Sequence, residues 1–133
     1  MPPELWTLHR YFIWANRMRT HFHQILAREQ RPFEGTAFIE SFLYMSYWYG
    51  GLFVVIEGWK ELQLSDSVID GLLASPNVEL LRRYRNGVFH FQRDYHDQRF
   101  HEFMTQGIDE IVWVRALNEQ FGRFFLEQIN RRA

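Results

Sequence analysis

Hydrophobic residues recur at intervals of three and four along most of this chain, the spacing that places them on one face of an α-helix. In the first segment these positions are Leu8, Tyr11, Phe12, Ala15, Met18, Phe22, Ile25 and Leu26. They predict one long amphipathic helix over residues 4–29. Pro32 and Gly35 follow, and both residue types interrupt helices, so the chain should turn between residues 31 and 35.

The second predicted helix runs from Ala37 to about Leu62, with Thr36 as its cap. Residues 44–56 are apolar nearly all round, which is typical of a central helix covered on several sides. Within them, residues 54–56 (Val-Val-Ile) alone would suggest a strand. The length of the segment and its flanking pattern favour a helix instead.

Two glycines, Gly50 and Gly51, lie in the middle of this helix. Each costs roughly 1 kcal/mol relative to alanine in a helix interior. They therefore indicate a close helix crossing or a kink, with an unoptimised position as the plain alternative.

The next segments predict a short helix from Ser65 or Asp66 through Leu73 and a longer one from Pro76 to about Gln92. The buried stripe of the longer helix is predicted to be Leu81, Tyr84, Val88 and Phe91. After it, residues 94–106 should form a loop with a short helix that Gly107 ends.

A last helix is predicted from Asp109 to about Asn130. Its core face consists of Ile111, Val114, Leu117, Phe121, Phe124, Phe125 and Ile129. The whole pattern predicts an all-α, up-and-down bundle of four main helices plus short helices. Its 133 residues suit a single domain over 1–133, and 47% hydrophobic residues suffice for a packed core. An aromatic content of 18% also points to a buried subunit interface.

Composition excludes several classes of protein. The chain has no cysteine, so disulfides and thiolate metal sites are excluded. No uncharged apolar run approaches ~20 residues, so no transmembrane span is expected. The first residues lack the basic and then apolar pattern of a signal peptide. We therefore expect a cytoplasmic protein without membrane contacts.

The formal net charge of −1 argues against a generally basic nucleic-acid binder, but the charges are unevenly placed. Residues 34–80 hold seven acids and only Lys60 as a base. Residues 82–93 hold no acid and four arginines, which are Arg82, Arg83, Arg85 and Arg93. A local basic stripe fits a phosphate-bearing ligand, with a solvated helix face as the alternative.

The candidate chemistry lies in this stripe, at Arg85, Asn86 and His90. On a helix, Asn86 and His90 share a face, and the long Arg85 side chain can reach over the same groove. Gly87 leaves room there for a ligand or a second backbone. We predict that His90 exchanges a proton with the attacking or leaving oxygen, and that Arg85 stabilises charge on a phosphoryl transition state. Asn86 would orient His90 or bind the phosphate.

Substrate contacts are also expected from nearby basic side chains, namely Arg82, Arg83, Arg93 and His96. The pairs His90–Asp94 and Asp97–His101 have a four-residue spacing that could chelate a metal. A turn expected between the pairs favours a solvated polar surface, so no metal site is predicted. No cofactor is predicted, and the sequence has no glycine-rich phosphate loop.

Purely structural roles are the alternative to this catalytic interpretation. A histidine among aromatic residues is more often a satisfied, partly buried side chain than a catalyst. Arg85 could be a structural partner of an acid such as Glu57, which is a lone carboxylate within an apolar run. Alternatively, Glu57 could orient Arg85 or His90.

Residues 85–90 (Arg-Asn-Gly-Val-Phe-His) resemble the signature of the HEPN superfamily, the higher eukaryotes and prokaryotes nucleotide-binding domains. That signature is an arginine, usually a polar residue next, and a histidine four to six residues after the arginine. The stretch from Trp48 to Leu62 is also similar to small bacterial HEPN-like proteins. The resemblance places Arg85, Asn86 and His90 at active-site positions.

The resemblance implies a homodimer with two copies of the motif across a shared groove. It also implies a metal-independent endoribonuclease of a toxin, phage-defence or RNA-processing system, with RNA as substrate. A toxin would have an antitoxin protein as its partner. The alternative is a non-catalytic HEPN-like module that binds a nucleotide or a partner protein.

Overall fold

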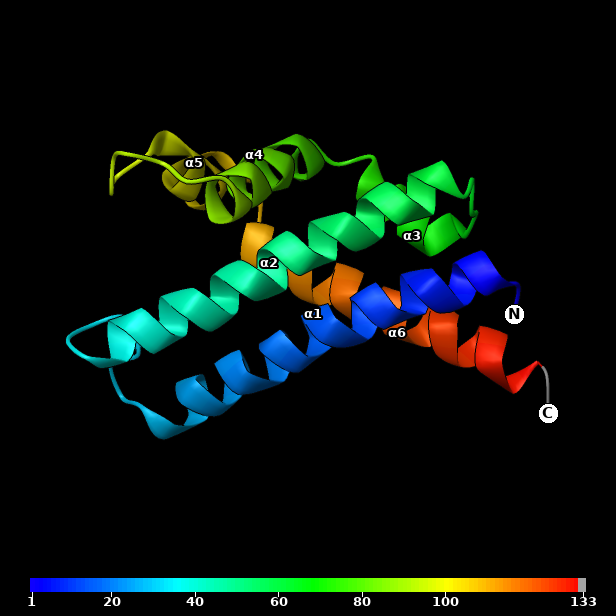
Figure 1. Ribbon diagram of the computed structural model, residues 1–133, viewed down its shortest axis with the longest axis horizontal. Helices are drawn as coiled ribbons and strands as arrows, with labels where there is room; N and C mark the ends of the chain where they lie inside the picture. The colour runs from blue at the N-terminus through cyan, green and yellow to red at the C-terminus, as the bar shows by residue number, and fades with distance from the viewer. Residues whose placement is uncertain (132–133) are drawn as a thin grey trace.

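The computed structural model describes residues 1–131 of the chain and contains six helices over that range (Figure 1). They are α1 (Pro3–Arg28), α2 (Ala37–Glu61), α3 (Ser67–Leu73), α4 (Asn77–Phe89), α5 (Gln98–Gln106) and α6 (Glu110–Asn130). The predicted all-α fold of four main helices plus short ones is therefore confirmed, and residues 54–56 are helical.

Helices α1 and α2 lie side by side and run in opposite directions, with α4 on the other side of α2 (Figure 1). Short α3 packs against α6, and α5 packs against α4. The start of α1 and the end of α6 lie near each other at one end of the molecule (Figure 1). Helix α2 is thus the central element, as its nearly uniform apolar character predicts.

The apolar character of α2 is accounted for by packing. By length and composition this helix could cross a membrane, but 56% of its most apolar window is buried inside the protein. Trp48, Leu52, Val55 and Ile56 are fully covered by neighbouring helices. A buried core helix can be as long and as apolar as a membrane-spanning helix.

The glycines of α2 mark close approaches, as expected. A Cβ atom on Gly51 would lie 3.1 Å from the Cβ of Ala15, so this is where α1 crosses α2. A Cβ on Gly50 would lie 2.7 Å from the ring of Phe89, at the end of α4. A Cβ on Gly58 would overlap the buried side chain of Leu8. The missing side chains let two helices approach α2 closely.

The core is dominated by aromatic rings whose polar atoms are satisfied within the chain. The indole nitrogens of Trp48, Trp59 and Trp113 donate to Asn118, Asp70 and the Leu72 carbonyl. The buried Tyr84 hydroxyl is 2.8 Å from that of Ser46. Much of the aromatic content is therefore used inside one subunit, rather than at a subunit interface.

Several local predictions were wrong. Helix α4 ends at Phe89 rather than near Gln92, and Phe91 is 91% exposed instead of buried. Ile111 was predicted on the core face of α6 but is exposed, and Trp113 is buried in its place. The Thr36 side chain makes no capping hydrogen bond at the start of α2.

Candidate functional site

Arg85 lies on α4 and reaches across to α2. Its Nη1 donates to Glu57 Oε1 at 2.6 Å, and its Nε donates to Asn86 Oδ1 at 3.0 Å. The guanidinium also lies over the Phe53 ring, 4.9 Å from the ring centre. These three contacts leave its side chain only 19% exposed. Within residues 1–131, the Nη2 atom has no hydrogen-bond partner, so one edge of the fork stays available to a ligand.

The contact with Glu57 was foreseen as the structural alternative for Arg85. Glu57 is not buried, however, because its side chain is 48% exposed. The same geometry fits the other expectation, that this carboxylate orients Arg85. Because the Glu57 carboxylate is half exposed, the ion pair contributes little to stability, and its main effect is to hold the guanidinium in one place.

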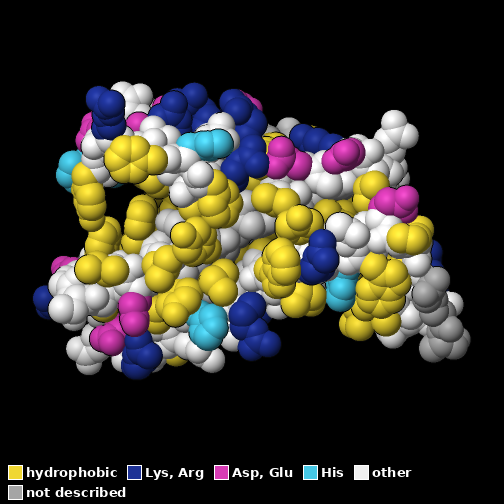
Figure 2. Space-filling model, in the orientation of Figure 1, with side chains coloured by type: hydrophobic (Ala, Val, Ile, Leu, Met, Phe, Trp, Pro, Cys, Tyr) yellow, Lys and Arg dark blue, Asp and Glu magenta, His cyan; other side chains and the backbone are white. Residues whose placement is uncertain are grey.

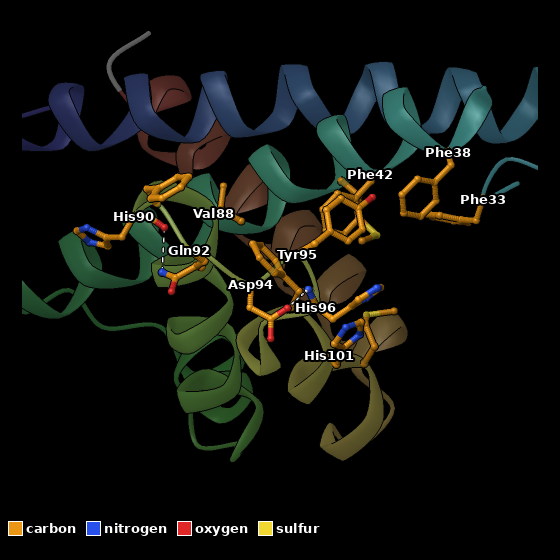
Figure 3. Close-up of a pocket in the computed structure, with 15 residues that line it drawn as sticks. Phe33, Phe38, Phe42, Val88, His90, Gln92, Asp94, Tyr95, His96 and His101 are labelled. Atoms are coloured by element: carbon orange, nitrogen blue, oxygen red, sulfur yellow. Dashed lines mark hydrogen bonds between the residues drawn. The ribbon is translucent and has the colours of Figure 1, made fainter. Parts of the chain in front are cut away.

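His90 lies beyond the helix, not on it. Its backbone is extended (φ −119°, ψ 128°), and its N–H makes the last helical hydrogen bond, to the Asn86 carbonyl. Asn86 and His90 therefore do not share a helix face. The imidazole is exposed, and no other described residue hydrogen bonds to it or stacks on it. Figure 3 shows the ring directed away from Phe42, Tyr95 and His96.

Gly87 is buried at the contact between α4 and α5. A Cβ atom there would lie 3.2 Å from both the Arg99 Cβ and the Phe100 ring. The neighbouring helix α5 fills the space that this glycine leaves. The sequence allowed two options there, a ligand or a second backbone.

The basic stripe is largely neutralised inside the chain. Arg82 pairs with Glu79, and Arg83 pairs with Glu102 of α5. The side-chain hydrogen bonds that the two guanidinium groups donate to these acids are the largest cause of their raised pKa values. Arg93 is exposed and has no ion-pair partner among residues 1–131. Of the four arginines, it is the most exposed, and the other three each have a carboxylate partner.

An aromatic cavity of about 630 Å³ lies beside the motif, between α2, α5 and the segment that joins α4 to α5. Figure 2 shows a hollow bordered by hydrophobic side chains in this part of the molecule. Its walls include Phe42, Val88, Tyr95 and Phe100, and its polar rim includes Asp94, His96 and His101 (Figure 3).

His96, predicted as a substrate contact, lies on the rim of this cavity. The His96 backbone N–H donates to Asp94 Oδ1 at 2.9 Å, and its ring stacks on His101 with the centres 6.0 Å apart. Within the described part of the chain, no group of three or more His, Asp or Glu side chains could hold a metal ion.

The cavity and the Phe53 contact were not predicted. The signal for the cavity was the aromatic residues on both sides of the motif, Phe38 and Phe42 before it and Phe91, Tyr95 and Phe100 after it. Periodicity assigns such residues to a core and gives no indication that they leave a space.

No family model, curated protein or solved structure matches this chain. The function of this chain is therefore inferred from its residues and their geometry.

Proposed function

We propose that this chain is a HEPN-like, metal-independent endoribonuclease that acts in the cytoplasm as a homodimer. One observation carries the proposal. The Arg85 guanidinium is held by Glu57 and Asn86 with one edge free, and five residues later the chain presents an exposed imidazole that no described residue engages. A fixed cation and a free acid–base group are the two elements that phosphodiester transesterification requires.

The proposed reaction is an attack by an RNA 2′-hydroxyl on the adjacent phosphorus atom. The bond from phosphorus to the 5′-oxygen breaks as the bond to the 2′-oxygen forms. The products are a 2′,3′-cyclic phosphate and a 5′-hydroxyl. His90 accepts the proton from the attacking oxygen or supplies one to the leaving oxygen. Arg85 Nη2 stabilises the charge that develops on the non-bridging oxygens.

The other candidate residues take supporting roles. Asn86 holds Arg85 through its amide oxygen. Arg93 is the basic side chain best placed to contact the RNA backbone, because it has no intramolecular ion pair within residues 1–131. Arg82 and Arg83 contribute less, since each already has a carboxylate partner. A toxin or defence role would add an antitoxin protein as partner.

A second function is favoured by a different observation. The aromatic cavity beside the motif has the size and apolar walls of a small-molecule site, and Arg85 is partly neutralised by Glu57. A non-catalytic module would use the cavity for a nucleotide base or for a partner side chain.

Cleavage of a mixed-sequence labelled RNA in EDTA distinguishes the two functions. We expect the wild type to cut and leave cyclic-phosphate ends. His90→Ala and Arg85→Ala should each lose at least about a hundredfold in rate, as for removal of an acid–base group or an oxyanion donor. His21→Ala, at a histidine on α1, is the control and should cut normally. Equal cutting by all four proteins would reveal a contaminant and refute the assignment.

The pH dependence of the rate adds a second test. A histidine that moves a proton in the transition state makes the rate change across the neutral range.

If the folded wild type binds nucleotide but does not cut any RNA, the non-catalytic module replaces the enzyme.

A further inference from the structure

A second cleft lies between α1 and α6, and it shares no lining residue with the motif or the aromatic cavity. Its volume is about 450 Å³. One face of α1 supplies Phe12, Asn16, Arg19 and His23, and one face of α6 supplies Arg115, Asn118, Glu119 and Gly122. This volume falls in the range of small-molecule sites, roughly 300–1,000 Å³.

The inner wall of the cleft is an ordered hydrogen-bond chain. The buried Asn118 accepts from Trp48 Nε1 at 3.0 Å through Oδ1 and donates to Asn16 Oδ1 at 3.1 Å through Nδ2. The same Asn16 oxygen accepts from Arg19 Nε at 2.7 Å. The amide oxygens on this wall are therefore engaged, and the Arg19 guanidinium is fixed in direction.

His23 continues the chain. Arg19 Nη1 is 3.1 Å from His23 Nδ1, and because a guanidinium only donates, Nδ1 must accept. The imidazole is thus neutral, with its proton on Nε2. That atom is the one buried side-chain nitrogen or oxygen in residues 1–131 without a hydrogen-bond partner. Burial, and then the positive charges of Arg19 and Arg115, lower the pKa of His23.

The charges in the cleft do not balance. Arg19 is partly buried, yet neither it nor Arg115 has a carboxylate within ion-pair distance in the described part of the chain. Seven other arginines do have such a carboxylate, namely Arg28, Arg31, Arg82, Arg83, Arg85, Arg99 and Arg123. Glu119 is the one acid that lines the cleft, and it pairs with neither cation. Partly buried charges in proteins are usually compensated by an opposite charge.

We propose that the α1–α6 cleft binds the phosphate group of a small molecule between Arg19 and Arg115. The donors come from two helices on opposite walls, so a tetrahedral anion can accept from both at once. Phe12 and Gly122 line the remainder of the cleft with apolar surface and leave space for the organic part of the molecule. The inference does not rest on the proposed ribonuclease, since it uses none of the motif residues.

The test is a titration of the full chain with inorganic phosphate, adenosine 5′-monophosphate and acetate, against chloride at equal ionic strength. Proton NMR of the His23 ring reports directly on the cleft. Bound phosphate should raise the pKa of His23, because the anion offsets the positive charges of Arg19 and Arg115. The change should saturate with phosphate and be absent with acetate.

Three variants make the test specific. Arg115→Gln, at an exposed position, should weaken phosphate binding at least about tenfold, as expected for loss of a charge-assisted hydrogen bond. Glu119→Gln should tighten binding, because it removes the one acid of the cleft. Arg17→Gln, at an exposed arginine of α1 outside the cleft, should change nothing.

Tighter binding of the nucleotide than of phosphate would assign the cleft to a phosphomonoester, and equal binding would assign it to free phosphate. The proposal is overturned if phosphate leaves His23 unchanged, if acetate acts equally, or if Arg115→Gln binds as the wild type does. RNA cleavage is a separate readout that none of these outcomes affects.

Discussion

At the scale of single residues, the Glu57–Arg85 pair determines how the motif can act. The Glu57 carboxylate is half exposed to water, so its loss should change stability little, whereas it fixes where the Arg85 guanidinium points. We predict that Glu57→Gln lowers the free energy of unfolding by no more than about 1 kcal/mol. Glu57→Gln should lower the rate of RNA cleavage by more than this small loss of stability can explain.

Urea denaturation and the cleavage assay measure the two effects on the same protein. The control is Glu61→Gln, one helical turn further along α2, where no ion pair is made within the described residues. If Glu57→Gln cuts RNA at the wild-type rate, the carboxylate does not position Arg85 for catalysis.

Asp66 carries a second prediction at this scale. Its side chain caps α3 by accepting from the Val68 and Ile69 N–H groups, and it also pairs with Arg123 of α6. Burial raises the pKa of Asp66, but hydrogen bonds from Ile69, Arg123 and Val68 outweigh it, so the pKa lies below the ordinary value of 3.8. We expect Asp66→Ala to cost about 0.5–2 kcal/mol, as for loss of other helix caps.

The pH dependence of this loss follows from the lowered pKa. A carboxylate with a lower pKa in the folded state stabilises the protein above the unfolded pKa, and the stabilisation is lost as pH falls through the folded pKa. The difference between wild type and Asp66→Ala should therefore be constant at neutral pH and shrink below about pH 4. Urea unfolding at several pH values measures it, and a constant difference down to pH 2 would contradict the lowered pKa.

At the scale of helices, two glycines should respond in opposite ways to the same substitution. A Cβ on Gly58 of α2 would overlap the Cδ1 atom of Leu8, a buried side chain that would then have to shift. A Cβ on Gly71 of α3 meets nothing within 4 Å. Gly58→Ala should lower the free energy of unfolding by about 1–3 kcal/mol through overpacking. Gly71→Ala should raise it by roughly 0.4–1 kcal/mol through helix propensity and a more restricted unfolded chain.

Thermal and urea unfolding of the two variants provides the measurement. A free energy of unfolding that Gly58→Ala leaves unchanged or raises would mean that the contact of α1 with α2 does not constrain Gly58.

The helices were predictable where apolar residues recur along the full length, on one face in α1 and nearly all round in α2. The end of α4 was not, because Phe91 continues the apolar spacing although the chain has already left the helix at His90. The spacing of apolar residues does not predict the contact of Phe89 with Gly50, and this contact fixes where α4 meets α2. The ion pair of Glu57 with Arg85 was considered because Glu57 is a lone acid in an apolar run. The α1–α6 cleft was not predicted, because it joins residues about a hundred positions apart in the sequence.

At the scale of the whole molecule, one apolar surface remains uncovered next to the motif. Ile39, Leu43 and Tyr47 follow one another at four-residue spacing on α2 and are all exposed. Phe89 stacks on Tyr47 at 5.7 Å, so this surface continues to the end of α4. Contiguous exposed apolar surfaces of this kind commonly mark protein–protein interfaces. A second copy of the chain on this surface would bring two motifs together, as the proposed homodimer requires.

A charge in the middle of this surface should separate the two subunits. We predict that the wild type sediments as a dimer and that Ile39→Glu, at a side chain 72% exposed, raises the dissociation constant at least about tenfold. The isolated subunit should stay folded, because Ile39 is not part of the core. Val112→Glu, at an equally exposed position (69%) on α6, should leave the dimer intact. Since the groove between two motifs would be lost, Ile39→Glu should also lose RNA cleavage although Arg85 and His90 are unchanged. A monomeric variant that still cuts RNA at the wild-type rate would show that one copy of the motif is sufficient.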